Sequence, residues 1–261
     1  MPARTETQTG NCSKFTGTKK LIVKPLCCNS VEKMKSTFIS SLLFACIVNT
    51  AFAQQRTITV QFLPLYNSAP VELGKKYLYK SDSIEIETLK FYISGIQFYK
   101  DGKLVGATEK KHHLVDAENP ASFIITNSHA NNAPYNRLRF SIGVDSVTNE
   151  AGAIGGDLDP TNGMYWEWRS GYINVKLEGH SRLCPARRNQ FAFHIGGYQY
   201  PYNTIQNLDL PVANNDKIII GFDVSGVLNQ INLGELYEAM SPSEKAMGIA
   251  KKIGAAFRIE Q

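Results

Sequence analysis

The 261-residue sequence shows little net charge and few cysteines once its N-terminal segment is set apart. The whole chain has 28 Lys and Arg against 23 Asp and Glu, with five cysteines. Residues 1–53 hold seven of the basic residues, two of the acidic ones and four of the cysteines. The remaining 208 residues therefore carry 21 charges of each sign and one thiol, Cys184. This balance excludes an intramolecular disulfide and a Cys-rich zinc site there, and it offers no positive field for nucleic acid.

The apolar stretch near the N-terminus is too short to span a membrane comfortably as a helix. Residues 38–52 carry no charge, follow Met34-Lys35 and run into Ala51-Phe52-Ala53. A short basic start, a short apolar region and small residues before the cleavage point are typical of a secretory signal. We predict a signal peptide over 34–53, cleaved after Ala53, and a periplasmic or extracellular protein with no integral membrane span.

Two alternatives compete with a cleaved signal at Ala53. The stretch could be a buried core helix, or it could be a lipoprotein signal ending at Cys46. The lipoprotein alternative is the weaker fit, because bulky Phe44 and the apolar residues after Cys46 depart from that pattern. Residues 1–33 carry no periodic pattern and precede the basic start of the signal, so we expect translation to begin at Met34 and treat 1–33 as a non-structural extension.

The segment 54–261 has the alternation of a β protein. Apolar and polar residues alternate at period two over 57–62, 137–142 and 172–178, and two further strands are predicted at 191–195 and 217–222, the latter apolar enough to be central. Such short runs, separated by Gly, Asn, Asp and Pro, are typical of an antiparallel sandwich. A strand over 91–99 followed by Asp101-Gly102 predicts a hairpin, because glycine accepts the positive φ of the turn.

Only the C-terminal segment has the sequence pattern of a helix. Ser241-Pro242-Ser243-Glu244 predicts an N-cap at Ser241, with Pro242 in the first helical position and Glu244 completing a capping box. Apolar residues then recur at helical spacing, which predicts an amphipathic helix over 242–258. No internal repeat or low-complexity linker is present. We therefore predict one all-β domain, an antiparallel β-sandwich over 54–261 that includes this C-terminal helix.

The most informative stretch is 155–172, which contains both tryptophans of the protein. If the segment is extended, Trp166 and Trp168 share one face of a strand. The indoles could instead be ordinary core packing. Asp157, Asp159 and Asn162 resemble an oxygen-rich calcium loop, but the spacing departs from the EF-hand, so a capping or turn role is favoured.

The residues Gly155-Gly156-Asp157-Leu158-Asp159-Pro160, Met164-Tyr165-Trp166-Glu167-Trp168 and 191–197 resemble the MbnP-like copper-binding family, whose members are related to the partner encoded with methanobactin genes. The resemblance covers nearly all of the chain from Ile58 to Ile259. It implies a secreted β-sandwich that binds copper through histidine. It also implies a diheme peroxidase as partner, which in some members oxidises a tryptophan to kynurenine. Matched residue by residue, the functional positions that the resemblance implies are His194 and the pair Trp166 and Trp168.

The residue chemistry is compatible with copper, since imidazole suits both oxidation states and thioethers suit Cu(I). The candidate metal ligands are His194, His129 and His180, with Met164 and Met240 as soft additions. If 172–180 and 190–197 form a hairpin, His180 and His194 lie roughly 13 Å apart, so they would be poor joint ligands. The tryptophans would lie beyond the far end of that hairpin. A site that they share with His194 therefore needs a bend near Ser170-Gly171 or another strand.

The remaining candidates are weaker. His112 and His113 are adjacent in an expected strand and point to opposite faces, so at most one could join a site. Cys184 near Arg187 and Arg188 is either a reactive thiol or a buried loop thiol.

No nucleophile elbow, His-Glu-x-x-His motif or phosphate loop is present, so we expect no enzyme. The alternative to copper binding is a non-enzymatic module with an aromatic surface for carbohydrate or protein partners. That surface would consist of Trp166, Trp168, Tyr165, Tyr172, Tyr198, Tyr200 and Tyr202.

Overall fold

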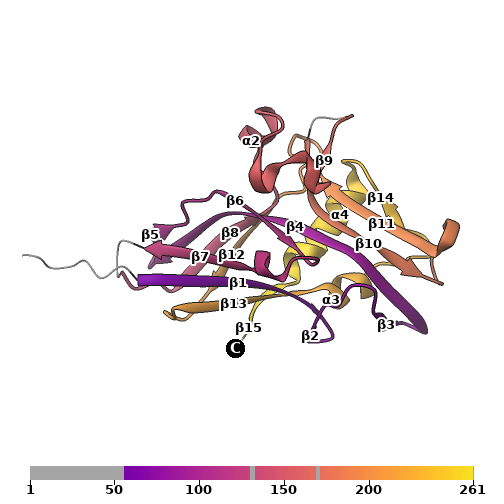
Figure 1. The fold of residues 1–261 in the computed structure, drawn as a ribbon, viewed down its shortest axis with the longest axis horizontal. Helices are drawn as coiled ribbons and strands as arrows, with labels where there is room; N and C mark the ends of the chain where they lie inside the picture. The colour runs from indigo at the N-terminus through magenta and orange to yellow at the C-terminus, as the bar shows by residue number, and fades with distance from the viewer. Residues whose placement is uncertain (1–55, 130–132, 169–170, 261) are drawn as a thin grey trace, which may run out of the picture. The chain divides into compact units, whose positions relative to one another are not determined.

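In the computed structural model, residues 56–129, 133–168 and 171–260 are described, and they form two β-sheets around a common core (Figure 1). The predicted extension 1–33 and signal segment 34–53 lie outside these residues. In the described part of the chain, no helix combines the length and apolar character needed to cross a bilayer. The prediction of a mostly β sandwich-like fold with few helices is confirmed.

The smaller sheet is organised around one long strand, β1. It consists of β1 (Arg56–Tyr66), β2 (Ala69–Pro70), β7 (Ile124–His129), β13 (Lys217–Asp223) and β15 (Phe257–Glu260). β1 pairs antiparallel with β7 but parallel with β13. β13 lies between β1 and β15, which confirms the prediction that 217–222 is a central strand. The parallel pair makes this sheet mixed rather than purely antiparallel.

The larger sheet is organised around β4, which pairs with β8 on one side and β10 on the other. Its strands are β3 (Lys76–Tyr79), β4 (Asp82–Lys100), β5 (Lys103–Ala107), β6 (His112–Asp116), β8 (Arg137–Ile142), β9 (Tyr165–Trp166), β10 (Gly171–Ser181), β11 (Gln190–Gly196), β12 (Gln206–Pro211) and β14 (Glu238–Ala239). The predicted hairpin of β10 and β11 is present. The predicted turn between β4 and β5 is also confirmed, with positive φ at Asp101 (48°) and Gly102 (81°).

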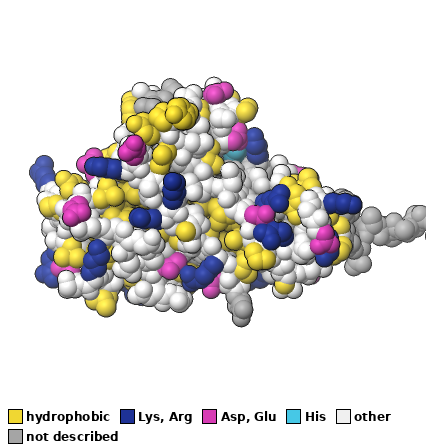
Figure 2. All heavy atoms as spheres, turned by 180° about the vertical axis from the view of Figure 1, so that it is seen from behind, with side chains coloured by type: hydrophobic (Ala, Val, Ile, Leu, Met, Phe, Trp, Pro, Cys, Tyr) yellow, Lys and Arg dark blue, Asp and Glu magenta, His cyan; other side chains and the backbone are white. Residues whose placement is uncertain are grey.

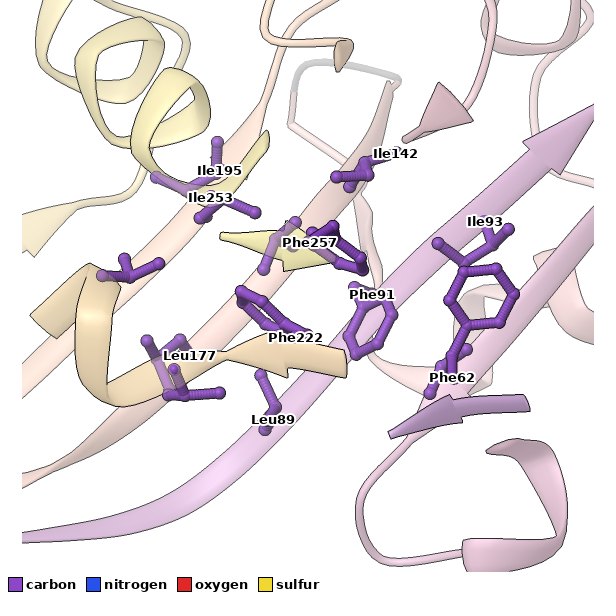
Figure 3. Close-up of a cluster of buried hydrophobic side chains, with 14 of the residues drawn as sticks. Phe62, Leu89, Phe91, Ile93, Ile142, Leu177, Ile195, Phe222, Ile253 and Phe257 are labelled. Carbon is purple, nitrogen blue, oxygen red and sulfur yellow. The ribbon is translucent and has the colours of Figure 1, made fainter. Parts of the chain in front are cut away.

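The main core fills the space between the two sheets (Figure 3). Phe91 of β4 meets Phe222 of β13 edge-on, with ring centroids 5.4 Å apart. Phe222 in turn stacks on Phe257 of β15 at 4.6 Å, with the rings 9° from parallel. Rings of this size bury much apolar surface, which is the main favourable term in folding. The core therefore joins the middle of one sheet to the C-terminal strand of the other.

The helices are short, apart from the predicted one at the C-terminus. They are α2 (Ser146–Glu150), α3 (Val224–Asn229), α4 (Glu244–Ala255) and the 3-10 turns η1 (Pro120–Phe123), η2 (Gly156–Leu158), η3 (Pro160–Asn162) and η4 (Arg187–Asn189). α2 and α3 were not expected. Each is capped by an aspartate at its N-terminus, Asp145 for α2 and Asp223 for α3, and each is too short to show a clear helical period.

The bounds predicted for the C-terminal helix were wrong at both ends. The N-cap is Ser243 rather than Ser241, and its hydroxyl accepts a hydrogen bond from the amide of Ala246 at 3.2 Å. The helix ends at Ala255, because Phe257 instead enters β15 and pairs with Phe222. A buried strand position next to β13 is therefore favoured over one more helical turn. The buried residues of α4 keep the predicted spacing, at Ala246, Ile249, Ala250 and Ile253.

Candidate metal centre

His194 lies on the face of β11 that points away from the main core. Its neighbours Phe193 and Ile195 belong to the core between the sheets, and the strand alternation turns His194 to the other side. His194 is only 8% exposed there. The alternation along the predicted strand 191–195 therefore accounts for the position of His194 opposite Phe193 and Ile195.

Glu178 of β10 holds the imidazole of His194. The distance from His194 Nε2 to Glu178 Oε1 is 2.6 Å. Glu178 pairs with Ala192, two residues before His194, so the two side chains share this face of the hairpin. The hydrogen bond from His194 lowers the pKa of Glu178 to about 2, against the opposing effect of burial. Glu178 is therefore ionised at neutral pH and can only accept, so Nε2 carries the hydrogen.

This arrangement determines which ring nitrogen can bind a ligand. With the proton on Nε2, the lone pair of a neutral imidazole is on Nδ1. Histidines that bind metals commonly give their other N–H to a carboxylate, which fixes the ring and raises its basicity. Sequence reasoning did not single out Glu178. The register of the predicted hairpin could have identified it. Once the turn is fixed, the register shows which residues of the two paired strands share a face, and Glu178 shares one with His194.

Met240 directly follows β14, at the edge of the sheet beside β11. β14 runs parallel to β11, with Phe193 opposite Ala239, and this register continued by one position would set Met240 opposite His194. Ala239 faces the core, and Met240 turns to the other side with 41% of its surface exposed. The thioether of Met240 is therefore the soft donor that this register would bring to the side of the sheet that carries His194. The other soft candidate, Met164, is fully buried in an apolar cluster.

Trp166 folds back over the same face. β9 pairs antiparallel with the first residues of β10, with Trp166 opposite Gly171. The indole lies on Gly196, since a β-carbon at Gly196 would come within 2.7 Å of the ring. Gly196 follows His194 by two residues and so faces the same side. The bend that a site shared by His194 and the tryptophans requires is therefore present in the β9–β10 hairpin.

The two tryptophans differ in their surroundings. Trp166 is 6% exposed and joins a second cluster on the outer face with Tyr92 and Met164. Trp168 is 65% exposed, and its ring centroid is 5.8 Å from that of Trp166. The condition under which both indoles would share one face of a strand is not met, because the chain turns after Trp166. The indoles touch across this turn.

His180 engages a different carboxylate. Its Nε2 lies 2.9 Å from Glu87 Oε2, and its Nδ1 lies 3.0 Å from the carbonyl oxygen of Arg188. His180 pairs with Gln190, whereas His194 pairs with Lys176, so the two histidines lie four register positions apart. The structure therefore does not bring these two candidate ligands together.

His129 ends β7, in the smaller sheet, where it pairs with Arg56. Strand pairing thus places it in a different sheet from His194. His112 and His113 point to opposite faces, as expected. His112 is buried and bonds Ser94 and Thr148, while His113 Nε2 lies 3.0 Å from the carbonyl of Lys110. Burial lowers the pKa of both imidazoles.

The acidic loop before β9 has the predicted capping role. Asp159 caps η3 by accepting from the amide of Thr161 at 2.8 Å. Asp157 accepts from the amide of Leu114 at 2.9 Å and pairs with Lys110 at 2.6 Å. These bonds tie the loop to β6. The carboxylates are thus occupied by the protein's own donors, which argues against a calcium loop.

Cys184 is a fully buried free thiol whose Sγ lies 3.0 Å from the carbonyl oxygen of Gln190. This supports the buried loop thiol over the reactive one. Among the described residues, no group of three or more His, Cys, Asp or Glu side chains is arranged to hold a metal ion. A metal bound at His194 would thus take donors of other kinds, for which Met240 is the candidate.

Comparisons with known proteins agree with this fold. The family model described as MbnP matches residues 55–244. Among solved structures, MbnP from Methylosinus trichosporium superposes with a TM-score of 0.58 at 13% sequence identity, and the match covers 79% of this chain and 98% of that one. At that identity the likeness is one of fold. The comparison with curated proteins found no match.

Proposed function

The chain belongs to the MbnP family, and from this membership we propose that it is an exported protein that binds copper for storage or delivery. Family membership indicates a methanobactin-associated, copper-related role. The finer proposal is a binding protein rather than an enzyme, with His194 as its principal ligand. Cleavage after Ala53 would deliver the described domain to the periplasm or the medium.

The pairing of His194 with Glu178 is the observation that carries this proposal. Their 2.6 Å contact orients the ring and leaves Nδ1 as the donor nitrogen. Met240, one position past the paired residues of β14, would add a thioether, and imidazole with thioether is a donor set that suits Cu(I). Hard divalent ions prefer oxygen ligands. The chemistry of these residues therefore fits a soft monovalent copper ion.

Trp166 is the tryptophan best placed to contribute to such a site. It lies over Gly196, on the same face as His194, whereas Trp168 is at the surface. Oxidation of an indole to kynurenine produces an aromatic amine and a ketone, both of which can act as metal ligands. We propose Trp166 as the residue that a diheme peroxidase would modify. The exposed ring of Trp168, in contact with Trp166, would face that partner.

The test is a competition titration of the mature protein with Cu(I) and Cu(II). We expect one copper per chain, with Cu(I) bound more tightly. His194→Ala should lower the affinity at least tenfold, which is about 1.4 kcal/mol. His180→Ala is the matched control, since it also removes a strand histidine paired with a carboxylate, and it should leave affinity unchanged. Equal affinity in wild type and His194→Ala would refute the assignment.

A second measurement tests the modification. Protein made in its native host should yield a peptide containing residue 166 with the mass shift of kynurenine. The same peptide from a heterologous host without the peroxidase should be unmodified. If the mass shift falls on residue 168 instead, the choice of Trp166 is wrong.

A further inference from the structure

A cavity of about 150 Å³ opens beside the proposed copper site, between the segment after β11 and the start of β10. Half of its ten lining residues are aromatic. They are Trp166, Tyr172, Tyr198, Tyr200 and Tyr202. Tyr200 is 98% exposed, so the cavity opens to solvent along this residue. Figure 2 shows hydrophobic side chains gathered at the top of the molecule, the end at which Figure 1 labels β9.

Two glycines lie in the wall of this cavity. A β-carbon at Gly171 would lie 3.6 Å from the ring of Tyr198, so that ring packs directly over the strand. Gly197 has a φ of +122°, and a β-carbon there would lie 2.3 Å from the carbonyl oxygen of Tyr202. A side chain at Gly197 would therefore displace the segment that carries the tyrosines. The backbone around the cavity depends on glycine at this position.

The side chains that line the cavity determine which kind of ligand it can bind. None of the ten described residues around the cavity carries a charged side chain. The hydroxyl of Tyr172 is already bonded to the carbonyl of Leu158 at 3.1 Å. An anion would find no positive partner, whereas the side chain of Gln199 and the tyrosine hydroxyls offer hydrogen bonds that a sugar could use. Aromatic faces, however, attract cations through the ring quadrupole without needing hydrogen bonds.

We propose that this cavity binds a quaternary ammonium group. Weakly hydrated cations of this kind are recognised by cages of aromatic side chains. The volume is about five times the share of liquid volume of one water, which is about 30 Å³. A tetramethylammonium ion has five non-hydrogen atoms and fits this volume. The open side at Tyr200 leaves room for the remainder of a choline or betaine. Trp166 belongs to both proposed sites, but the ligand proposed here needs neither copper nor a modified tryptophan, so the two proposals fail separately.

The test is calorimetric titration of copper-free protein with choline and with its neutral isostere, 3,3-dimethylbutan-1-ol. Cation–π attraction should make choline bind at least about tenfold more tightly. Tyr200→Ala should weaken choline binding, and Tyr200→Phe should retain it, because the ring is what matters. This exposed position can change without disturbing the core. Leu104→Ala, at an exposed site that does not line the cavity, is the control.

Three results would overturn the proposal. Equal binding of choline and the neutral alcohol would show an ordinary apolar pocket. Binding of methyl glucoside in place of choline would assign the cavity to a sugar. Absence of choline binding at millimolar concentrations, in wild-type protein that is folded by circular dichroism, would remove the site. If choline binds, sedimentation with phosphatidylcholine vesicles, compared with phosphatidylglycerol vesicles, separates a lipid headgroup from a free solute as its source.

Discussion

The two faces of the larger sheet are built from alternate residues of the same strands, yet they serve different purposes. Phe91, Leu177 and Phe193 face the smaller sheet and are at most 2% exposed. Their neighbours Tyr92, Glu178 and His194 face the other way. The inner face consists of apolar side chains packed against a second sheet. The outer face combines a small apolar cluster with polar groups that bond one another.

The inner face of the larger sheet stabilises the fold, whereas the outer face carries the residues proposed to bind copper. Burial of apolar area between the sheets stabilises the fold, and a polar group there would lose its water without gaining a partner. On the outer face, loops and β9 cover the sheet only in part, so a carboxylate can hold an imidazole at the boundary with solvent. One strand alternation therefore separates the residues that support the fold from the residues that are proposed to bind copper.

The largest expected effect comes from the inner face. Phe91→Ala should lower the free energy of unfolding by about 3–5 kcal/mol, because it opens a cavity against Phe222 and Phe257. Urea denaturation followed by circular dichroism measures this loss. The affinity of the folded fraction for copper should stay the same. A loss below about 1 kcal/mol would mean that the inner face is not the main source of stability.

A smaller effect on stability, but a larger one on the site, is expected at Gly196. Gly196→Val places a side chain where the Trp166 ring lies, which should cost about 2–3 kcal/mol and displace the indole. Copper affinity and tryptophan fluorescence should both change. Gly248→Ala is the matched control, since a β-carbon there meets nothing within 4 Å. Unchanged fluorescence in Gly196→Val would contradict the packing of Trp166 on β11.

Glu178→Gln should act on the outer face alone. The pKa of Glu178 is lowered from 4.5 to about 2 by its bond to His194, so its ionised form stabilises the fold above pH 4.5. That contribution is lost as the pH falls from 4.5 towards 2. The free energy of unfolding of the variant should be lower by about 2 kcal/mol at pH 7. It should also change less with pH between 4.5 and 2 than the free energy of unfolding of the wild type. Parallel acid denaturation curves for wild type and variant would exclude this role.

The smallest effect on stability is expected at Trp168. Its ring is 65% exposed, so Trp168→Ala should change the free energy of unfolding by less than about 0.5 kcal/mol. Oxidation of Trp166 by the proposed peroxidase should nevertheless slow, if Trp168 forms part of the docking surface. A thermal melt and the yield of modified peptide give both values. A large loss of stability would show that Trp168 belongs to the outer cluster.

The sequence predicts the strands well because their alternation is local. The five runs at 57–62, 137–142, 172–178, 191–195 and 217–222 all fall in strands. The turn at Asp101-Gly102 and the face of His194 follow from the same local rules. The parallel pairing of β1 with β13 could not be predicted, since it joins segments about 160 residues apart and no local pattern encodes it.

The candidate site was predicted only in part, because its geometry also depends on packing and pairing that no local pattern encodes. His194 and the tryptophans were identified, but their meeting depends on the return of β9 onto β10 over Gly196. Met240 follows the parallel strand β14, which has only two residues and which no local pattern in the sequence encodes. The C-terminal helix was extended too far because Phe257 fits helical spacing as well as strand pairing. Long-range packing decides such cases.

X-ray absorption of the Cu(I)-loaded protein tests the central claim most directly, namely that copper binds at the outer face between His194 and Met240. Wild type should show one sulfur and at least one imidazole nitrogen bound to copper. Met240→Leu, which conserves volume, should lose the sulfur signal, while Met164→Leu should keep it. A sulfur signal that persists in Met240→Leu, or that disappears in Met164→Leu, would contradict this account of the site.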